Sequence, residues 1–149
     1  MGSTTVAGTA LAISAGIPAT QTEAGYSALT YTEIGGIEKI GSIGAVTNKV
    51  EFQPLKGAKQ KHKGSTDYGS LQPSMAHDKA DAGQTLLRTA SAPDNHALYA
   101  FKATYPNGDV RYWQGRVFGY PEMVDGADTI LMANPTIEID TAIVKVDAT

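Results

Sequence analysis

The chain of 149 residues contains no cysteine, so it has no disulfide framework, no thiolate nucleophile and no cysteine-bound zinc. A domain of this length buries roughly 68–70% of its unfolded surface and needs neither a disulfide nor a metal to fold. No apolar run approaches the roughly 18 residues that a membrane span requires. The net charge of −3 argues against general attraction to nucleic acid. We therefore expect one folded domain over residues 1–149, with no membrane segment.

Charge is also absent from the start of the chain, where the first charged residue is Glu23. A neutral start lacks the basic region of a secretory signal, so we expect a protein that stays in the cytoplasm unless lysis releases it. Val6 to Ile13 fits a strand, and residues 14–28 fit a loose segment. We therefore predict an N-terminal arm over residues 1–28. It is either a frayed terminus or a segment that orders against a partner subunit.

Strand patterns dominate the rest of the sequence. Residues 103–117, ATYPNGDVRYWQGRV, predict one β-hairpin, because apolar and polar residues alternate on both sides of a turn at Asn107-Gly108. Residues 35–55 predict two short strands interrupted by glycines. Apolar residues between 130 and 146 supply the closing strands. We expect residues 141–149 to form a C-terminal tail.

One helix is predicted at about residues 80–91. Asp81 is suited to cap its first turn, and Gln84 stands where the reciprocal partner of a capping box is found. Pro93 follows its end. Several short strands with one helix indicate a mainly β fold, a β-sandwich or barrel-like subunit with one flanking α-helix. Trp113 is predicted in the core, and Tyr112, on the opposite side of its strand, at a subunit seam.

No motif sets a nucleophile against a base or gathers metal ligands. The sequence IGSIG around Ser42 has Ile40 where a nucleophile elbow requires glycine. The three histidines, at positions 62, 77 and 96, lack metal-binding spacing. We therefore expect no enzyme, no catalytic residues, no cofactor and no metal site.

The segment over about residues 47–78 is polar, and we expect a long loop that projects from the body. Four of the nine lysines fall within eight of its residues, and Lys59, Lys61 and Lys63 share one face if the segment is extended. Residues 49–63 carry five lysines and one glutamate, whereas residues 109–149 carry seven acids and three bases. Either the loop is simply solvated, or one subunit's basic loop meets another's acidic surface. Contact of the second kind builds rings or filaments.

The stretch DAGQTLLRTASAPDNHALYAFKATYPNGDVRYWQGRVFGYPEMVDGADTILMANPTIEID resembles the core of phage tail tube proteins of the lambda type, from siphophages. The shared order is a capped helix, a strand, YPNG, an aromatic strand containing QGRV, and a closing strand. The likeness covers roughly residues 65–140.

The resemblance implies a structural subunit of the virion tail, assembled in the host cytoplasm. Six subunits would form a ring, and stacked rings a tube through which DNA passes without specific binding. Its partners would be further copies of itself and the tape measure, tail terminator and tip proteins. The family carries a long loop that reaches a neighbouring subunit or ring, and by matching order this loop falls at residues 56–68. The resemblance therefore implies contact residues in this segment. They are Lys56, Lys59, Lys61, His62, Lys63, Asp67 and Tyr68.

A DNA conduit needs a wall that does not hold phosphates, because basic surfaces bind DNA tightly through counterion release. We therefore predict a lumen lined by acidic and neutral side chains, with the lysines of residues 56–63 turned to the ring interface. The nearest alternative is a secretion-system-like tube or another tail component. An alternative of another class is a monomeric β-sandwich binding module with an aromatic platform of Tyr99, Tyr105, Tyr112 and Trp113. A hydrolase is the weakest alternative, since no catalytic set can be named.

Overall fold

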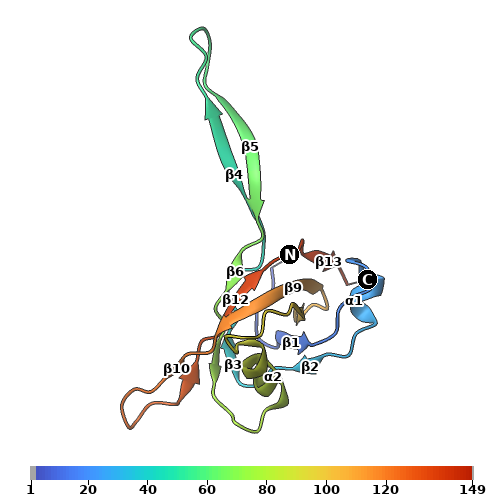
Figure 1. The fold of residues 1–149 in the computed structure, drawn as a ribbon, viewed down its shortest axis with the longest axis vertical. Helices are drawn as coiled ribbons and strands as arrows, with labels where there is room; N and C mark the ends of the chain where they lie inside the picture. Colours follow the sequence, from blue (N-terminus) through green and yellow to red (C-terminus); the bar gives the residue numbers. More distant parts are fainter. Residues whose placement is uncertain (1–2, 149) are drawn as a thin grey trace.

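The computed structural model describes residues 3–148, in which antiparallel sheets pack together with two short helices (Figure 1). The main sheet follows the path β2-β1-β8-β9-β12-β6, and β13 also pairs with β9. Its strands are β1 (Ala10–Ser14), β2 (Thr32–Glu33), β6 (Ser70–Leu71), β8 (Tyr99–Thr104), β9 (Val110–Gly119), β12 (Thr136–Ile139) and β13 (Val144–Val146). The predicted mainly β fold class is confirmed.

A smaller sheet has the order β10-β11-β7-β3. Its strands are β3 (Ile37–Lys39), β7 (Ser74–Ala76), β10 (Glu122–Met123) and β11 (Met132–Ala133). Side chains from both sheets and from helix α2 (Ala82–Ala90) meet in one hydrophobic core, in which Trp113, Met75 and Leu87 are fully buried. Burying such side chains stabilises the fold by about 1.5–3 kcal/mol each.

The predicted hairpin at 103–117 is confirmed as β8 and β9. Phe101 lies opposite Trp113, and their rings stack with centroids 5.8 Å apart. The turn closes through the Tyr105 amide, which donates to the Asp109 carbonyl at 2.8 Å. Gly108 takes a φ of +96°, a conformation that favours glycine. Trp113 therefore lies in the core, as predicted.

The predicted helix is confirmed as α2, but its expected capping box is only half formed. The Asp81 carboxylate accepts a hydrogen bond from the Gln84 amide at 3.0 Å. The Gln84 side chain does not return to Asp81. It accepts from the Asp78 amide at 2.9 Å and donates to the carbonyls of Gly35 and Ala76 at 2.8 and 2.9 Å. Gln84 therefore joins the helix to the smaller sheet.

The N-terminal region is more integrated than the arm expected over residues 1–28. Strand β1 pairs along its whole length with β8. A second helix, α1 (Glu23–Ser27), lies in the segment expected to be loose, and its Tyr26 is fully buried against Tyr112, with ring centroids 5.3 Å apart. Tyr112 therefore lies beneath α1 within the subunit, which corrects its predicted place at a seam. Likewise, β13 within the expected tail pairs with β9.

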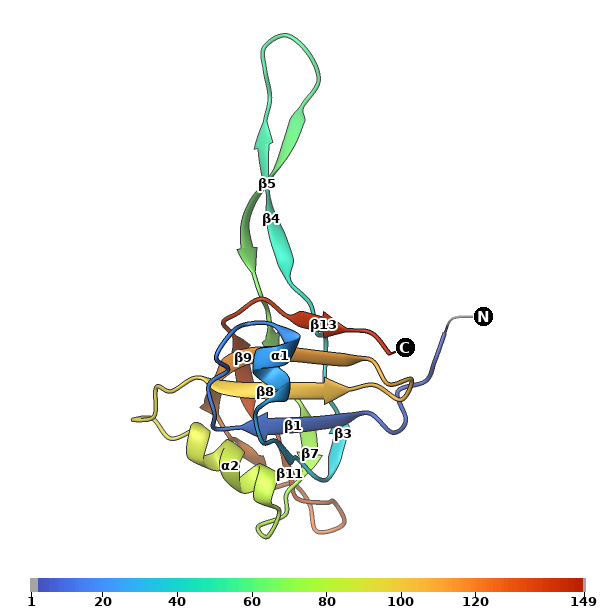
Figure 2. The same ribbon diagram turned by 90° about the vertical axis from the view of Figure 1, so that its right-hand side faces the viewer.

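The segment expected to be a loop over residues 47–78 does project from the body, but as paired strands (Figures 1 and 2). Strands β4 (Val46–Phe52) and β5 (Gln60–Asp67) form an antiparallel hairpin, which we call the long hairpin, and β6 and β7 follow within the main body. Strands β3 and β4 lie within residues 35–55, where two short strands were predicted. The polar composition concealed β5, because neither face of the hairpin is buried in the subunit. Among residues 3–148, no helix is long and apolar enough to cross a membrane.

Candidate functional site

One side of the long hairpin is a lysine face, formed by Lys49, Lys61 and Lys63 with Glu51 among them. Lys49 lies opposite Lys63, and Glu51 lies opposite Lys61. The Glu51 carboxylate is 2.7 Å from the Lys49 Nζ and 3.5 Å from the Nζ of Lys59, which immediately precedes β5. The register confirms that Lys61 and Lys63 share a face. Exposed ion pairs of this kind contribute at most about 1 kcal/mol, and like charges directly opposite each other destabilise a strand pair.

The opposite side of the long hairpin exposes apolar side chains. Val50 and Phe52 are more than half exposed, and Val50 faces His62 across the strands. Val46, near the base, is similarly exposed, and Leu55, in the connecting turn, is fully exposed. A two-stranded hairpin alone is marginally stable in water, and exposed apolar side chains beside open strand edges favour association. The hairpin therefore has the surface chemistry of a contact element.

A β-bulge bends the hairpin near its base. The register shifts between Thr47 and Lys49, so that Asn48 lies opposite both Gly64 and Ser65. The Asn48 amide donates to the Ser65 hydroxyl at 3.0 Å. A bulge of this kind adds local twist to a strand pair.

The structure places six of the seven predicted contact residues on the exposed surface of the long hairpin. The exception is Tyr68, which follows β5 and packs partly buried against the main core. Asp67 is exposed but also shapes the base of the hairpin, because its carboxylate accepts from the Gly69 amide at 2.9 Å. The six exposed residues are Lys56, Lys59, Lys61, His62, Lys63 and Asp67.

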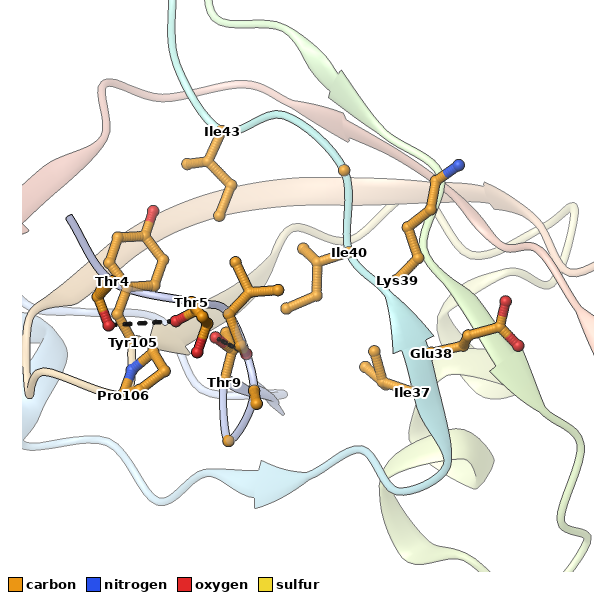
Figure 3. A pocket seen from close by; sticks show the side chains of 14 residues that line it. Thr4, Thr5, Thr9, Ile37, Glu38, Lys39, Ile40, Ile43, Tyr105 and Pro106 are labelled. Carbon is orange, nitrogen blue, oxygen red and sulfur yellow. Dashed lines mark hydrogen bonds between the residues drawn. The ribbon is translucent and has the colours of Figure 1, made fainter.

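An apolar groove of about 720 Å³ lies beside β3 and was not predicted from the sequence (Figure 3). Residues 4–9 form one wall, and residues 37–41 with Ile43 form the other. Ile40 and Ile43 point into the groove, whereas Glu38 points away from it (Figure 3). Within residues 3–148, β3 pairs only with β7. An apolar groove at an open sheet edge can receive an extended segment of another chain.

The aromatic platform considered for a binding module is not present. Trp113 is fully buried, and Tyr99 and Tyr112 are each only 6% exposed. Tyr105 is half-buried, with the Arg111 guanidinium 5.0 Å from the centre of its ring. These rings pack within the subunit. They therefore do not form the platform that the binding-module alternative requires.

The titratable groups with a clear shift are tyrosines in packed surroundings. Burial raises the pKa of Tyr26, Tyr31, Tyr112 and Tyr120. Ser42 is exposed and makes no side-chain hydrogen bond with any described residue. No group of three or more histidine, aspartate or glutamate side chains is placed to hold a metal ion between residues 3 and 148.

The arrangement of packed antiparallel sheets with a helix beside them is similar to that of chains in solved structures of a phage tail tube and of contractile injection systems. The chain matches a structure of the PVC sheath/tube terminator, from an extracellular contractile injection system in the extended state. The TM-score is 0.73 over 97% of each chain, at 7% identity.

Two further solved structures share the fold. A chain from the baseplate of the anti-feeding prophage (AFP) matches with a TM-score of 0.68 and 8% identity, over 98% of this chain and 97% of that one. The SPP1 tail tube matches with a TM-score of 0.64 and 14% identity, over 92% of this chain and 75% of that one. No family model and no curated protein sequence matches the chain. The predicted resemblance to tail tube proteins is therefore confirmed at the level of the fold.

Proposed function

We propose that the chain is a structural subunit of a phage tail tube, which assembles with copies of itself into stacked hexameric rings that form a conduit for DNA ejection. The observation that carries this proposal is the fold, which matches the SPP1 tail tube over 92% of this sequence. Assembly itself is then the function of the protein.

The surface of the subunit supports self-assembly. The long hairpin extends far from the body and exposes Val50, Phe52 and Leu55, and β3 leaves one edge of the smaller sheet open beside the apolar groove. Open edges and exposed apolar side chains are stabilised when another chain covers them. In the assembled tube, neighbouring copies cover these surfaces.

The contact residues proposed on the long hairpin lie at the boundary between subunits or rings, away from the lumen. A lumen of acidic and neutral side chains repels phosphate and lets DNA slide, whereas a lysine-lined wall would retain it. In the virion tail, the partners of the tube are further copies of this chain and the tape measure, tail terminator and tip proteins. None of these contacts requires a cofactor.

Negative-stain electron microscopy of the concentrated, purified chain tests the proposal. We expect hollow tubes of indefinite length, because nothing in the subunit itself sets where stacking stops. Particles that remain the size of one subunit at every concentration would contradict the proposal.

A tube terminator, or another tail or injection-system component, is the second candidate. It is favoured by the match to the PVC sheath/tube terminator, which covers 97% of both chains with a TM-score of 0.73. A terminator closes a tube and does not extend it. The same micrographs separate the two functions, because a terminator forms single rings that do not stack.

A further inference from the structure

The β10–β11 hairpin has a connecting segment whose charge is opposite to that of the long hairpin. We call residues 122–131, EMVDGADTIL, the acidic loop. It contains Glu122, Asp125 and Asp128 and no basic residue. None of these carboxylates makes an ion pair or a hydrogen bond within residues 3–148. The loop also exposes Val124 and Ile130, each by more than 70%.

Carboxylates elsewhere in the described chain either lie apart from other free carboxylates in the sequence or already form an ion pair or hydrogen bond. Asp140 pairs with Arg116 at 3.1 Å, and Asp147 with Arg111 at 3.6 Å. Asp81 caps α2. The acidic loop alone among residues 3–148 brings three unengaged carboxylates within seven positions of the sequence. It is therefore the densest run of unengaged carboxylates in the described sequence.

The lysine face has the complementary excess of charge. The long hairpin carries five lysines against Glu51 and Asp67. Glu51 is shared between Lys49 and Lys59, which leaves Lys61 and Lys63 without an ion pair among the described residues. Long lysine stems can lie on exposed aliphatic groups while their ammonium groups reach carboxylates. A surface that alternates carboxylates with aliphatic side chains, as the acidic loop does, suits this mode of contact.

The two surfaces cannot meet within one subunit. The long hairpin and the acidic loop extend from opposite ends of the molecule, as both views show (Figures 1 and 2). Their complementarity can therefore act only between separate chains, and two copies of this chain supply both surfaces. A contact between different surfaces of two identical subunits is heterologous, and it builds rings or filaments.

We propose that the lysine face of one subunit, extended by Lys59, docks onto the acidic loop of a second copy of this chain. Glu122, Asp125 and Asp128 receive the ammonium groups, and Val124 and Ile130 support the lysine stems. This inference rests on the proposed self-assembly and identifies the two surfaces that meet. The contact sets the register between subunits and speeds their association, as complementary charge does at other interfaces.

Charge reversal on each surface tests the contact. The hairpin variant carries Lys59→Glu, Lys61→Glu and Lys63→Glu, and the loop variant carries Glu122→Lys, Asp125→Lys and Asp128→Lys. Each variant alone places like charges at the contact, so we expect it to stay folded but to require a more than about tenfold higher concentration for assembly. An equimolar mixture restores opposite charge at every contact and should assemble as alternating copies. Assembly is measured by sedimentation and electron microscopy, and folding by circular dichroism.

A third protein controls for net charge. The distant variant carries Lys79→Glu, Lys145→Glu, Thr89→Glu and Ala142→Glu at exposed positions outside the hairpin and the groove, and its net charge equals that of the hairpin variant. It should assemble like the wild type. Assembly by the restored pairs should also weaken in about 1 M salt, where charges are screened beyond about 3 Å.

The outcomes separate this contact from the proposed function. If the wild type assembles and the loop variant does so equally well, the docking surface is wrong while the function stands. The same holds if the mixture fails to recover assembly. Fraying of the hairpin variant does not obscure the result, because the loop variant leaves the hairpin unchanged. A wild type that never associates overturns both the proposed function and the contact.

Discussion

Gln84 shows how one polar side chain can hold two elements of this fold together. It is fully buried, yet each of its side-chain polar atoms has a partner. It also accepts a hydrogen bond from the Tyr120 hydroxyl at 3.1 Å. Next to it, Gly83 allows α2 to approach the backbone closely, since a Cβ at this position would lie 2.3 Å from the Glu33 carbonyl oxygen.

Replacing Gln84 with alanine should lower the free energy of unfolding by about 3 kcal/mol, because a buried side chain is removed and the part-buried backbone groups of Asp78, Gly35 and Ala76 lose their partner. Gln53→Ala is a matched control at an exposed position, where the change should cost less than about 0.5 kcal/mol. Urea denaturation of both variants measures the difference. Equal stability of the two variants would show that the network contributes little.

At the scale of elements, helix α1 is held by a cluster of tyrosines. The Tyr31 hydroxyl donates to the Tyr26 carbonyl at 3.1 Å, and the Tyr26 ring stacks on Tyr112. Burial raises the pKa of Tyr31, and the nearby Tyr112 and Tyr26 raise it further. The folded protein therefore favours the neutral phenols more strongly than the unfolded chain does.

This cluster predicts a loss of stability in alkali. Below the ordinary tyrosine pKa of about 10, the stabilisation is fully present. As pH rises from that value through the raised pKa of the folded state, the unfolded chain loses protons first, and the free energy of unfolding falls. Tyr31→Phe should be about 1 kcal/mol less stable at neutral pH, since it lacks the hydrogen bond. It should, however, lose less stability in alkali. Parallel pH profiles from urea denaturation would contradict this role of Tyr31.

The strands of the long hairpin pack against each other and hardly at all against the rest of the subunit. All residues of β4 are exposed, as are all of β5 except Gly64. Val46 and Asp67 lie directly opposite each other at its base, so their Cα atoms are about 5 Å apart and can be joined by a two-residue turn.

Replacing residues 47–66 with Asn-Gly should therefore leave the body of the subunit intact. We expect the free energy of unfolding to change by less than about 0.5 kcal/mol, because no buried core residue is removed. Assembly should be lost, because the proposed contact element is gone. Urea denaturation and sedimentation of the same preparation give both results. A shortened chain that assembles like the wild type would exclude the hairpin from the interface.

Elements with a buried face could be predicted from the sequence more fully than those without one. The β8–β9 hairpin and α2 were found because burial imposes a regular apolar pattern and because turns and caps require particular residues. Of the long hairpin, β4 lies within the segment predicted to hold two short strands, whereas β5 is not predicted, because solvent surrounds both faces of the hairpin. Helix α1, of five residues, is too short for a periodic pattern, and its place depends on Tyr26 packing against the distant Tyr112. The groove beside β3 joins segments that only the fold brings together.

At the scale of the whole molecule, a closed core is combined with surfaces that the subunit leaves uncovered. Trp113, Met75 and Leu87 bring both sheets and α2 into one buried cluster, which needs no partner. In the proposed assembly, the long hairpin, the open edge of β3 and the acidic loop gain their partners from other chains. A stable body with complementary extensions at opposite ends is suited to a repeating assembly.

The most direct test of self-assembly is sedimentation velocity of the wild-type chain over a wide range of concentrations. The account predicts that the 15.6 kDa subunit gives way, as concentration rises, to rings and then to larger particles. A single species of 15.6 kDa throughout the series would contradict it.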